Sequence, residues 1–489
     1  MPRLGVCLLA LVWGGPVGAQ TAEMVHTASL GFHSQRDKLP LTPEQRREAD
    51  RLDQEAQSEL HAGQLGEALR RYAHAAAVLR DAPWTPDLEF AASLEGRIDH
   101  VMLEPAQVAT LALTALYPSN GKSAVSVYLV PAAKEGRAEQ ELASRAEVES
   151  TRLPFTVRAT IPETAPGTYY LELRLVLPDG PTPQELRRFY RKTFPVHVER
   201  LADEARRLRQ RLAKTQHDDS PALATAEYTL EFYGRTDHGQ VGVRRFSQYP
   251  FRDQFTAANA ILDARDAGQD PFAGNHGDFR RAYRSGVDGT LQPYRIFIPD
   301  RSDGSPAPLV VALHGAGGDE NDFFDDLPQS PLQLEAQRHG FFVVCPKGRG
   351  SQSGYRGEAS QDVFDVLAEV RREYRIDASR IYLMGHSMGA YATWRLAMEQ
   401  PDLFAALGPI SGGGDPKEIA RIGQIPEYIV HGAADQTVPV AQSRAMAEAA
   451  RKAGAEVVYV EVPDAGHQDA MIGQIGPMLD FFARHAKGW

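Results

Sequence analysis

An α/β fold is predicted for the C-terminal part of the chain: a mostly parallel sheet with helices on both faces. Short, continuously apolar segments alternate there with segments of helical pattern. Strands that are buried on both faces and joined by helical crossovers are typical of a parallel sheet. The predicted strands are residues 294–298, 309–313, 341–345, 381–384, 428–430 and 457–462, with helical segments such as 363–374 and 441–453 between them. Because ligands of such sheets bind at the carboxyl ends of the strands, a site is expected in the loops that follow them.

The chain of 489 residues is too long for one ordinary core, and the pattern before the sheet changes twice. Residues 40–104 are a predicted helical region, since apolar and alanine positions recur at helical spacing on both sides of Gly63, as in a helical hairpin. Short alternating strands separated by turns predict a small immunoglobulin-like β-sandwich over residues 105–200. A charged helical connector over residues 201–279 then leads to the α/β domain, residues 280–489.

The first residues resemble a secretory signal peptide. Arg3 is followed by an apolar run over residues 4–13 and by small residues at 17–19, so the predicted signal covers residues 1–19, with a buried N-terminal helix as the alternative. The run has about half of the ~20 residues that span a bilayer, and no later segment is long and apolar enough. We therefore expect an exported protein, periplasmic or secreted, without a membrane span. The net charge of −11 is spread along the chain and argues against a nucleic acid as partner, because phosphate-binding faces need clustered Lys and Arg.

A Gly-x-Ser-x-Gly motif lies between a predicted strand and a predicted helix. The motif is Gly385-His386-Ser387-Met388-Gly389, preceded by the apolar segment 381–384 and followed by the helical segment 390–398. A strand that turns into a helix through this motif is the nucleophile elbow of α/β-hydrolases, whose tight turn needs small residues two positions on either side of the serine. Ser387 is therefore the predicted nucleophile, and an ordinary Gly/Ser turn is the alternative.

The other two catalytic groups are expected later in the chain. A serine hydroxyl becomes a nucleophile when a histidine removes its proton and a carboxylate holds that histidine. α/β-Hydrolases carry these residues in the order Ser, acid, His. Asp435 follows the strand 428–430 and His467 follows the strand 457–462, so both are expected at the same edge of the sheet as Ser387. Asp435 is the predicted acid and His467 the predicted base.

Five other residues compete for these two roles. Asp464 and Asp415 are the rival acids, but the first is crowded against the predicted base and the second lies in a Gly-rich loop. His431 and His314 each precede a glycine at a strand end and are interpreted as structural. His386 adjoins the nucleophile, and its side chain is expected to support packing rather than to face the substrate.

Two hydrogen-bond donors are needed to stabilise the charged tetrahedral intermediate. The backbone N–H group of Met388, the residue after the nucleophile, is the first predicted donor. The segment 314–318, His-Gly-Ala-Gly-Gly, follows the strand 309–313 and exposes backbone amides. Ala316 is the preferred second donor and Gly317 the next, while a glycine-rich turn without a ligand role is the alternative.

Four segments together resemble one group of exported esterases. They are His-Gly-Ala-Gly-Gly-Asp-Glu-Asn at 314–321, the strand and elbow at 380–389, His-Gly-Ala-Ala-Asp at 431–435 and Asp-Ala-Gly-His at 464–467. The group contains feruloyl esterases, acetyl-xylan esterases and polyhydroxyalkanoate depolymerases, and it adjoins the catalytic domains of prolyl-oligopeptidase-type peptidases. The resemblance covers about residues 285–489 and implies an α/β-hydrolase fold that works without a cofactor or metal. Many secreted members of that group pair their cysteines, whereas here Cys345, predicted to be buried in a strand, is the only thiol left if Cys7 leaves with the signal.

Two loops carry weaker signals. The acidic loop 319–326 is interpreted as a solvated face in which Asn321 or Asp322 caps a helix, with a metal site as the alternative. The loop 347–360, which contains Tyr355, follows the carboxyl end of a strand and is expected either to contact substrate or to be plain surface.

These observations predict an exported serine hydrolase that cleaves carboxylic esters through an acyl-enzyme on Ser387. The expected substrate is a small-molecule or polysaccharide-linked ester. A serine peptidase of the prolyl-oligopeptidase class is the alternative, although residues 20–280 show no blade-like repeat of the propeller that those enzymes use. A third possibility is that the front half is a binding or scaffold module. The sequence identifies no partner protein.

Overall fold

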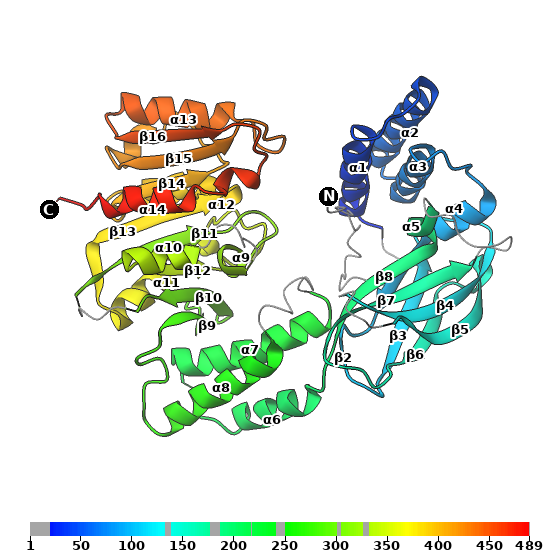
Figure 1. The fold of residues 1–489 in the computed structure, drawn as a ribbon, viewed down its shortest axis with the longest axis horizontal. Helices are drawn as coiled ribbons and strands as arrows, with labels where there is room; N and C mark the ends of the chain where they lie inside the picture. Colours follow the sequence, from blue (N-terminus) through cyan, green and yellow to red (C-terminus); the bar gives the residue numbers. More distant parts are fainter. Residues whose placement is uncertain are drawn as a thin grey trace. The chain divides into compact units, whose positions relative to one another are not determined.

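The computed structural model divides the chain into two compact units. It describes residues 20–132, 138–176, 186–216, 218–240, 250–300, 305–325 and 332–488. The first unit comprises Met1–Arg207 and Glu231–Asp253, and the second comprises Leu208–Leu230 and Gln254–Trp489 (Figure 1). The predicted signal peptide, residues 1–19, lies outside the described residues. Within the described part of the chain, no helix combines the length and the apolar character needed to cross a bilayer.

The first unit begins with three helices that share one core. They are α1 (Ala22–Arg36), α2 (Pro43–His61) and α3 (Leu65–Val78). α2 begins with a capping box, in which the Thr42 side chain accepts from the N–H of Gln45 and the Gln45 side chain accepts from the N–H of Thr42. α2 and α3 lie within the region predicted to be helical, whereas α1 begins before it. Val25 and Phe32 of α1 pack on α2 and α3, so α1 belongs to the same cluster.

Two antiparallel sheets follow in the first unit, after the short helix α4 (Pro86–Ser93). One sheet has the order β1-β3-β6 and consists of Leu94–Ile98, Val108–Ala115 and Phe155–Thr160. The other has the order β2-β8-β7-β4-β5 and consists of Met102–Leu103, Arg191–Val198, Gly167–Val176, Lys122–Pro131 and Gln140–Glu149, with only the short β2 parallel to its neighbour. The sheets face each other closely, since a Cβ atom on Gly96 of β1 would lie 2.5 Å from the Phe194 ring of β8. That the pair is an immunoglobulin-like sandwich stays a prediction.

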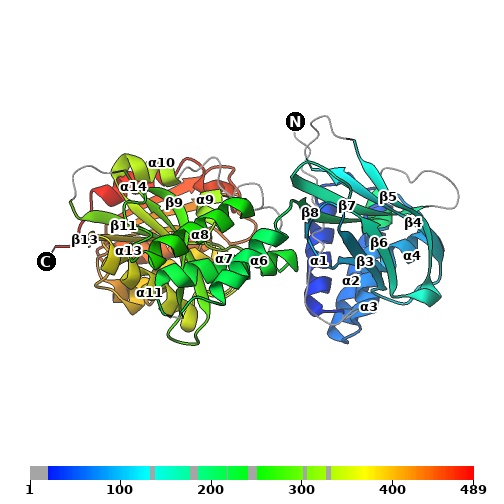
Figure 2. The same ribbon diagram turned by 90° about the horizontal axis from the view of Figure 1, so that it is seen from below.

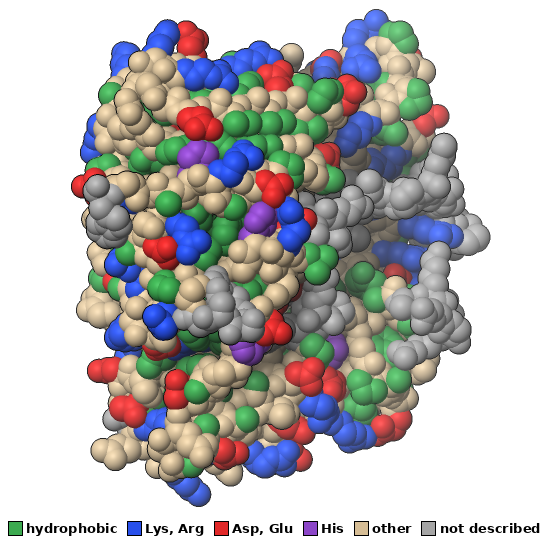
Figure 3. Space-filling model, turned by 60° about the vertical axis from the view of Figure 1, so that its left-hand side comes forward, with side chains coloured by type: hydrophobic (Ala, Val, Ile, Leu, Met, Phe, Trp, Pro, Cys, Tyr) green, Lys and Arg blue, Asp and Glu red, His purple; other side chains and the backbone are tan. Residues whose placement is uncertain are grey.

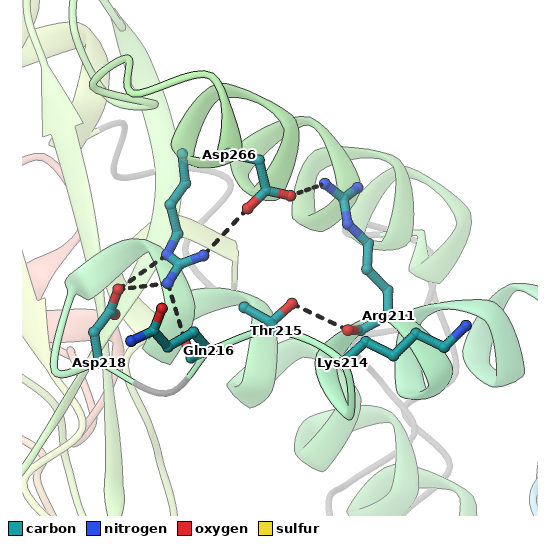
Figure 4. A pocket seen from close by; sticks show the side chains of 7 residues that line it. Arg211, Lys214, Thr215, Gln216, Asp218 and Asp266 are labelled. Atoms are coloured by element: carbon teal, nitrogen blue, oxygen red, sulfur yellow. Dashed lines mark hydrogen bonds and ion pairs between the residues drawn. The ribbon is translucent and has the colours of Figure 1, made fainter.

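Three charged helices lie in the predicted connector: α6 (Ala202–Leu212), α7 (Pro221–Asp237) and α8 (Phe251–Asp266). Each helix is divided between the two units, and the predicted domain limits stay predictions. A shallow polar pocket of about 580 Å³ lies beside α6 and α8 in the second unit (Figure 4). Its lining residues are Arg211, Lys214, Thr215, Gln216, Asp218, Arg265 and Asp266. Asp266 pairs with both arginines, at 3.0 Å from Arg211 and 3.2 Å from Arg265, so this pocket is a crevice between ion-paired side chains.

The second unit is built on an eight-stranded sheet. Its strands are β9 (Gly277–Arg284), β10 (Leu291–Ile298), β11 (Ala307–Leu313), β12 (Phe342–Pro346), β13 (Ile376–His386), β14 (Ala406–Ile410), β15 (Glu427–Gly432) and β16 (Val457–Val462). Their order is β16-β15-β14-β13-β11-β12-β10-β9. β11 to β16 are parallel, and β10 runs antiparallel to both β9 and β12. The prediction of a mostly parallel sheet is confirmed, while β9 and β14 are strands that sequence analysis missed.

Helices cover both faces of this sheet, as predicted (Figure 2). One face carries α10 (Leu332–His339) and α14 (Ile475–Ala483); the other carries α11 (Glu358–Glu373), α12 (Met388–Glu399) and α13 (Ala441–Lys452). Successive residues of β11 supply the two cores in turn: Leu309 and Val311 pack with α11 to α13, and Val310 and Ala312 with α10 and α14. On the face drawn in Figure 3, basic and acidic side chains are interspersed among the coloured residues.

Candidate active site

Ser387 lies in a strained turn between β13 and α12. Its backbone has φ 53° and ψ −115°, a left-handed conformation that non-glycine residues rarely adopt. The glycines on either side permit close backbone approach. A Cβ atom on Gly385 would lie 2.4 Å from the backbone of Gly389, and one on Gly389 would lie 2.1 Å from the Leu313 carbonyl oxygen of β11. The turn therefore has the geometry of the elbow that the motif predicts.

The structure brings Ser387, His467 and Asp435 together in one hydrogen-bonded chain. Ser387 Oγ lies 2.8 Å from His467 Nε2, and His467 Nδ1 lies 2.7 Å from Asp435 Oδ2. The residues follow β13, β16 and β15, at the carboxyl edge of the sheet. The rival acid Asp415 instead accepts a hydrogen bond from the backbone N–H of Lys417 in its own turn, at 3.0 Å. This arrangement can transfer a proton from the serine hydroxyl to the imidazole.

Asp435 is surrounded by donors. Its Oδ1 atom accepts hydrogen bonds from the backbone N–H groups of Thr437 at 2.8 Å and Val438 at 2.9 Å. Burial raises the pKa of this carboxyl, but the hydrogen bonds from His467 and from the two backbone groups outweigh that effect and hold the pKa below its usual value. Asp435 is thus a carboxylate at neutral pH and fixes the tautomer of His467 in which Nδ1 carries the proton.

Two further histidines border this chain. His386 Nε2 donates a hydrogen bond to the backbone oxygen of His467 at 3.0 Å, and burial lowers the pKa of His386 to about 4, so its ring is neutral. Its expected supporting role thus takes the form of a contact with the base. His431 Nε2 lies 3.1 Å from Asp435 Oδ2. Sequence analysis missed this second contact, for which the only available signal was the four-residue spacing from Asp435.

The loop after β11 lies beside Ser387. A Cβ atom on Gly315 would lie 3.1 Å from His386 Nδ1 and 3.5 Å from Ser387 Cβ. The backbone N–H of Gly317, the second candidate donor, is already bonded to the Ser351 oxygen at 2.8 Å. Among the described residues, no backbone hydrogen bond engages the N–H groups of Ala316 and Met388. Ala316 and Met388 therefore stay the predicted donors.

Tyr355 does not face a substrate. Its side chain is 0% exposed, and its hydroxyl oxygen accepts a hydrogen bond from the backbone N–H of His314 at 2.9 Å. Gly348 lies so close that a Cβ atom there would be 2.4 Å from the Tyr355 ring, and the N–H of Gly354 points at the sulfur of Met388, 3.3 Å away. Of the two alternatives for this loop, substrate contact does not fit Tyr355, whose buried side chain joins the loop after β12 to the loop 314–318 after β11.

The acidic loop that follows is partly buried, contrary to the expected solvated face. Glu320 is 1% exposed and lies 3.1 Å from Nε of Arg280. The Oδ1 atom of Asn321, also buried, accepts from Nη1 of Arg295 at 2.7 Å, and Asp325 lies 3.2 Å from the same nitrogen. Arginines from β9 and β10 thus pair with Glu320 and Asp325 of this loop.

One group of side chains in the described residues has the composition of a metal site: His100, Asp237 and His238, in the first unit. Their candidate ligand atoms all lie within 4.8 Å of one another. His100 Nδ1 and Asp237 Oδ2 already form a hydrogen bond of 2.7 Å. The group therefore contains a hydrogen-bonded His–Asp pair beside His238.

Part of this chain is similar to known hydrolases. Residues 310–422 match the model of the alpha/beta hydrolase family. A bifunctional acetylxylan esterase/xylanase of Neocallimastix patriciarum is 29% identical over 167 residues, 33% of this chain and 23% of that protein. Feruloyl esterase B of Talaromyces funiculosus is 29% identical over 135 residues, 25% of this chain and 37% of that protein. Poly(3-hydroxyalkanoate) depolymerase C of Paucimonas lemoignei is 30% identical over 148 residues, 26% of this chain and 32% of that protein.

The chain thus spans 23% to 37% of the length of these three relatives. The matched region contains Ser387, the loop 314–318, the end of β11 and all of β12 to β14. The second unit carries an alpha/beta hydrolase segment over residues 310–422, and the chain resembles the feruloyl and acetylxylan esterases and the polyhydroxyalkanoate depolymerases.

Proposed function

We propose that this protein is an exported serine hydrolase that cleaves carboxylic esters. The observation that carries the proposal is the unbroken chain from Ser387 Oγ through His467 to Asp435, with contacts of 2.8 Å and 2.7 Å, set on a strained elbow. Two of the three relatives described above are named as esterases, which supports an ester as the substrate rather than another acyl compound.

The first half of the reaction forms an acyl-enzyme. Ser387 Oγ attacks the ester carbonyl carbon while its proton passes to His467 Nε2. The N–H groups of Ala316 and Met388 stabilise the oxyanion that results. When the carbon–oxygen bond to the alcohol breaks, the leaving oxygen takes the proton from His467, and Asp435 stabilises the imidazolium between these steps.

The second half returns the enzyme to its starting state. A water molecule gives a proton to His467 Nε2 and adds to the acyl carbon, and the same two N–H groups stabilise the second oxyanion. Breaking the bond to Ser387 Oγ releases the carboxylic acid, and His467 returns the proton to the serine. No cofactor or metal takes part in this scheme.

Covalent labelling tests the nucleophile. A fluorophosphonate should label the wild-type protein at Ser387, and the Ser387→Ala variant should stay unlabelled with the same circular dichroism spectrum. A folded wild-type protein that takes up no probe would exclude the proposal. Equal labelling of both proteins would assign the nucleophile to another residue.

A peptidase of the prolyl-oligopeptidase class is the second candidate, because the same three residues could cleave an amide. Hydrolysis of p-nitrophenyl acetate should be compared with hydrolysis of proline-containing peptide amides at equal enzyme concentration. We expect turnover of the ester and little of the amides. Turnover confined to the amides would reverse the order of the two candidates.

The substrate class is proposed from the relatives, which are named for acetylated xylan, feruloyl esters and poly(3-hydroxyalkanoate). Acetylated and feruloylated sugars, 3-hydroxyalkanoate oligomers and short aryl esters form the matching screen. The helices and the two antiparallel sheets of the first unit are proposed as a binding module for a polymer. Retention of the full-length Ser387→Ala variant on insoluble polysaccharides would support that role, and uniform lack of retention would argue against it.

A further inference from the structure

Two loops at the carboxyl edge of the sheet are hydrogen-bonded to each other. They are the loop 314–318 after β11 and the loop 347–355 after β12, two strands that are neighbours in the sheet. The first loop contains Ala316, the predicted second oxyanion donor. Its backbone N–H groups donate at two points, His314 to the Tyr355 hydroxyl oxygen at 2.9 Å and Gly317 to the Ser351 backbone oxygen at 2.8 Å. The main chain is therefore held on both sides of Ala316.

The loop 347–355 is also bonded to α12, the helix that begins at Met388. The N–H of Gly354 points at the sulfur of Met388, 3.3 Å away. Nη2 of Arg395, further along the helix, donates a hydrogen bond to the backbone oxygen of Tyr355. Because Met388 supplies the other predicted donor, this one loop contacts both segments that carry the predicted donors. It therefore constrains how far apart those segments lie.

Tyr355 takes part in both sets of contacts, through its side chain on one side and its backbone on the other. The side chain is 0% exposed and belongs to the core that contains Val363 and Val366 of α11. Its ring centroid lies 5.3 Å from that of His314. The backbone has φ 52°, a conformation that a tyrosine rarely adopts and that persists only where the surroundings hold it. The hydroxyl group is therefore held at a fixed point.

Removal of this hydroxyl group would leave the N–H of His314 without its acceptor. His314 is 2% exposed, so water has little access to replace the hydroxyl. A buried N–H without a partner is costly, and we expect the loop 314–318 to shift until it finds another acceptor. A Cβ atom on Gly315 would lie only 3.5 Å from Ser387 Cβ, so a shift of this loop changes the place of the Ala316 N–H relative to the serine.

We propose that Tyr355 is a positioning residue of the oxyanion site, whose hydroxyl group fixes the loop 314–318 so that the N–H of Ala316 faces the oxyanion formed at Ser387. The inference rests on the proposed function and adds a specific residue to it. Donors that are already in place stabilise an oxyanion without reorganisation as the charge develops. The hydroxyl group should therefore matter more for the transition state than for the bound ester, whose carbonyl oxygen carries little charge.

Two variants and a matched control test this role. Tyr355→Phe removes the hydroxyl group and keeps the ring. Arg395→Met removes the hydrogen bond to the Tyr355 backbone, at a side chain that is 23% exposed. The control is Tyr382→Phe: Tyr382 of β13 is also 0% exposed, packs in the core on the opposite face of the sheet, and donates through its hydroxyl to the backbone oxygen of His485 at 2.8 Å.

The measured quantities are kcat and KM for p-nitrophenyl acetate, the rate constant of fluorophosphonate labelling and the melting temperature. We expect Tyr355→Phe to lower kcat by about 10- to 100-fold with KM within about 2-fold of the wild type, because only the transition state loses stabilisation. Labelling should slow by a similar factor, since the phosphonyl oxygen needs the same donors. Arg395→Met should lower kcat by about 3-fold at an unchanged KM, and Tyr382→Phe should melt at a lower temperature with wild-type kinetics.

A folded Tyr355→Phe protein with wild-type kcat and labelling would overturn the inference. An equal loss of kcat in Tyr382→Phe would reduce the effect of Tyr355 to stability, and a raised KM at wild-type kcat would assign the loop 347–355 to substrate binding instead. If Tyr355→Phe does not fold, Arg395→Met decides, and wild-type kinetics there would overturn the inference. A wild-type protein that neither hydrolyses the ester nor takes up the probe would exclude the proposed function itself, which is a separate result.

Discussion

Buried carboxyl groups lie at both ends of β15, and their pKa values are shifted in opposite directions. Glu427, its first residue, is 0% exposed and receives a hydrogen bond from Nε1 of Trp394 at 2.8 Å, while its Oε1 atom has no partner among the described residues. Burial raises the pKa of Glu427 to about 7. Asp435, just beyond the other end, is surrounded by N–H groups that hold its pKa below the usual value despite burial.

The difference shows that donors, rather than burial, decide the charge of these groups. Burial raises the pKa in both places. At the amino end the neighbouring amides are used by the sheet, since the N–H of Glu427 bonds to the Glu456 oxygen and that of Leu407 to the Pro426 oxygen. Past the carboxyl end the strand pairing stops, and amides of the turn become available to a side chain. A negatively charged side chain is therefore better stabilised at the carboxyl edge of the sheet than at the amino edge.

The largest effect is expected from Asp435→Asn. The amide keeps the shape of the side chain but carries no charge to stabilise the imidazolium of His467, so fluorophosphonate labelling should slow by about 10³- to 10⁴-fold. The paired variant Glu427→Gln makes the same change at the other end of β15 and should label within about 2-fold of the wild type. Asp435→Asn labelling at more than about a tenth of the wild-type rate would contradict the assigned role of the acid.

An intermediate effect is expected on stability from Glu427→Gln. The pKa of Glu427 is about 7 in the folded protein against an ordinary value of 4.5, so the folded state binds more protons between these values. The stability that the protonated group contributes is fully present below pH 4.5 and is lost as the pH rises through 7, by about 3 kcal/mol. Glutamine stays neutral throughout and should remove this part of the pH dependence.

Urea unfolding at intervals from pH 4.5 to 8 measures this difference. The free energy of unfolding of the wild type should fall more steeply with pH than that of Glu427→Gln. If the two curves of unfolding free energy against pH are parallel, a partner stabilises the ionised form of Glu427. The two carboxyl groups at the ends of β15 would then not differ in this respect.

The smallest effect is expected from Trp394→Phe, which removes the hydrogen bond to Glu427. The cost should be about 1–3 kcal/mol near pH 8, where Glu427 is ionised, and less near pH 4.5, where it is neutral. In a Glu427→Gln background the pH dependence of this cost should vanish, which a double-mutant cycle measures. A cost that is the same at every pH would assign Trp394 to packing alone.

Sequence patterns predicted the sheet. They also predicted that Ser387, Asp435 and His467 lie at one edge of it, because each residue follows an apolar strand and the carboxyl ends of parallel strands meet at the same edge. β14 escaped prediction because Gly408 and Pro409 are poor strand formers. Gly408 is required by packing, since a Cβ atom there would lie 2.4 Å from the sulfur of Met478.

The contacts that sequence patterns could not predict join loops that are distant in the chain. Tyr355 meets the backbone of His314 from the loop after β12, and Glu320 is buried against Arg280 of β9. No periodicity along the chain encodes such meetings, which depend on how loops pack once the sheet has formed. The acidic loop was predicted to be solvated because its arginine partners lie on separate strands and the sequence of the loop itself does not reveal them.

The glycines of the elbow have a consequence for protein engineering. Gly385 and Gly389 bring the backbones of β11, β13 and α12 within reach of one another, so a side chain at either position would collide with main-chain atoms that cannot turn aside. Saturation libraries directed at these two positions should yield unfolded clones. Ser351 and Gln352, the exposed residues of the segment 349–354, are better positions for diversification.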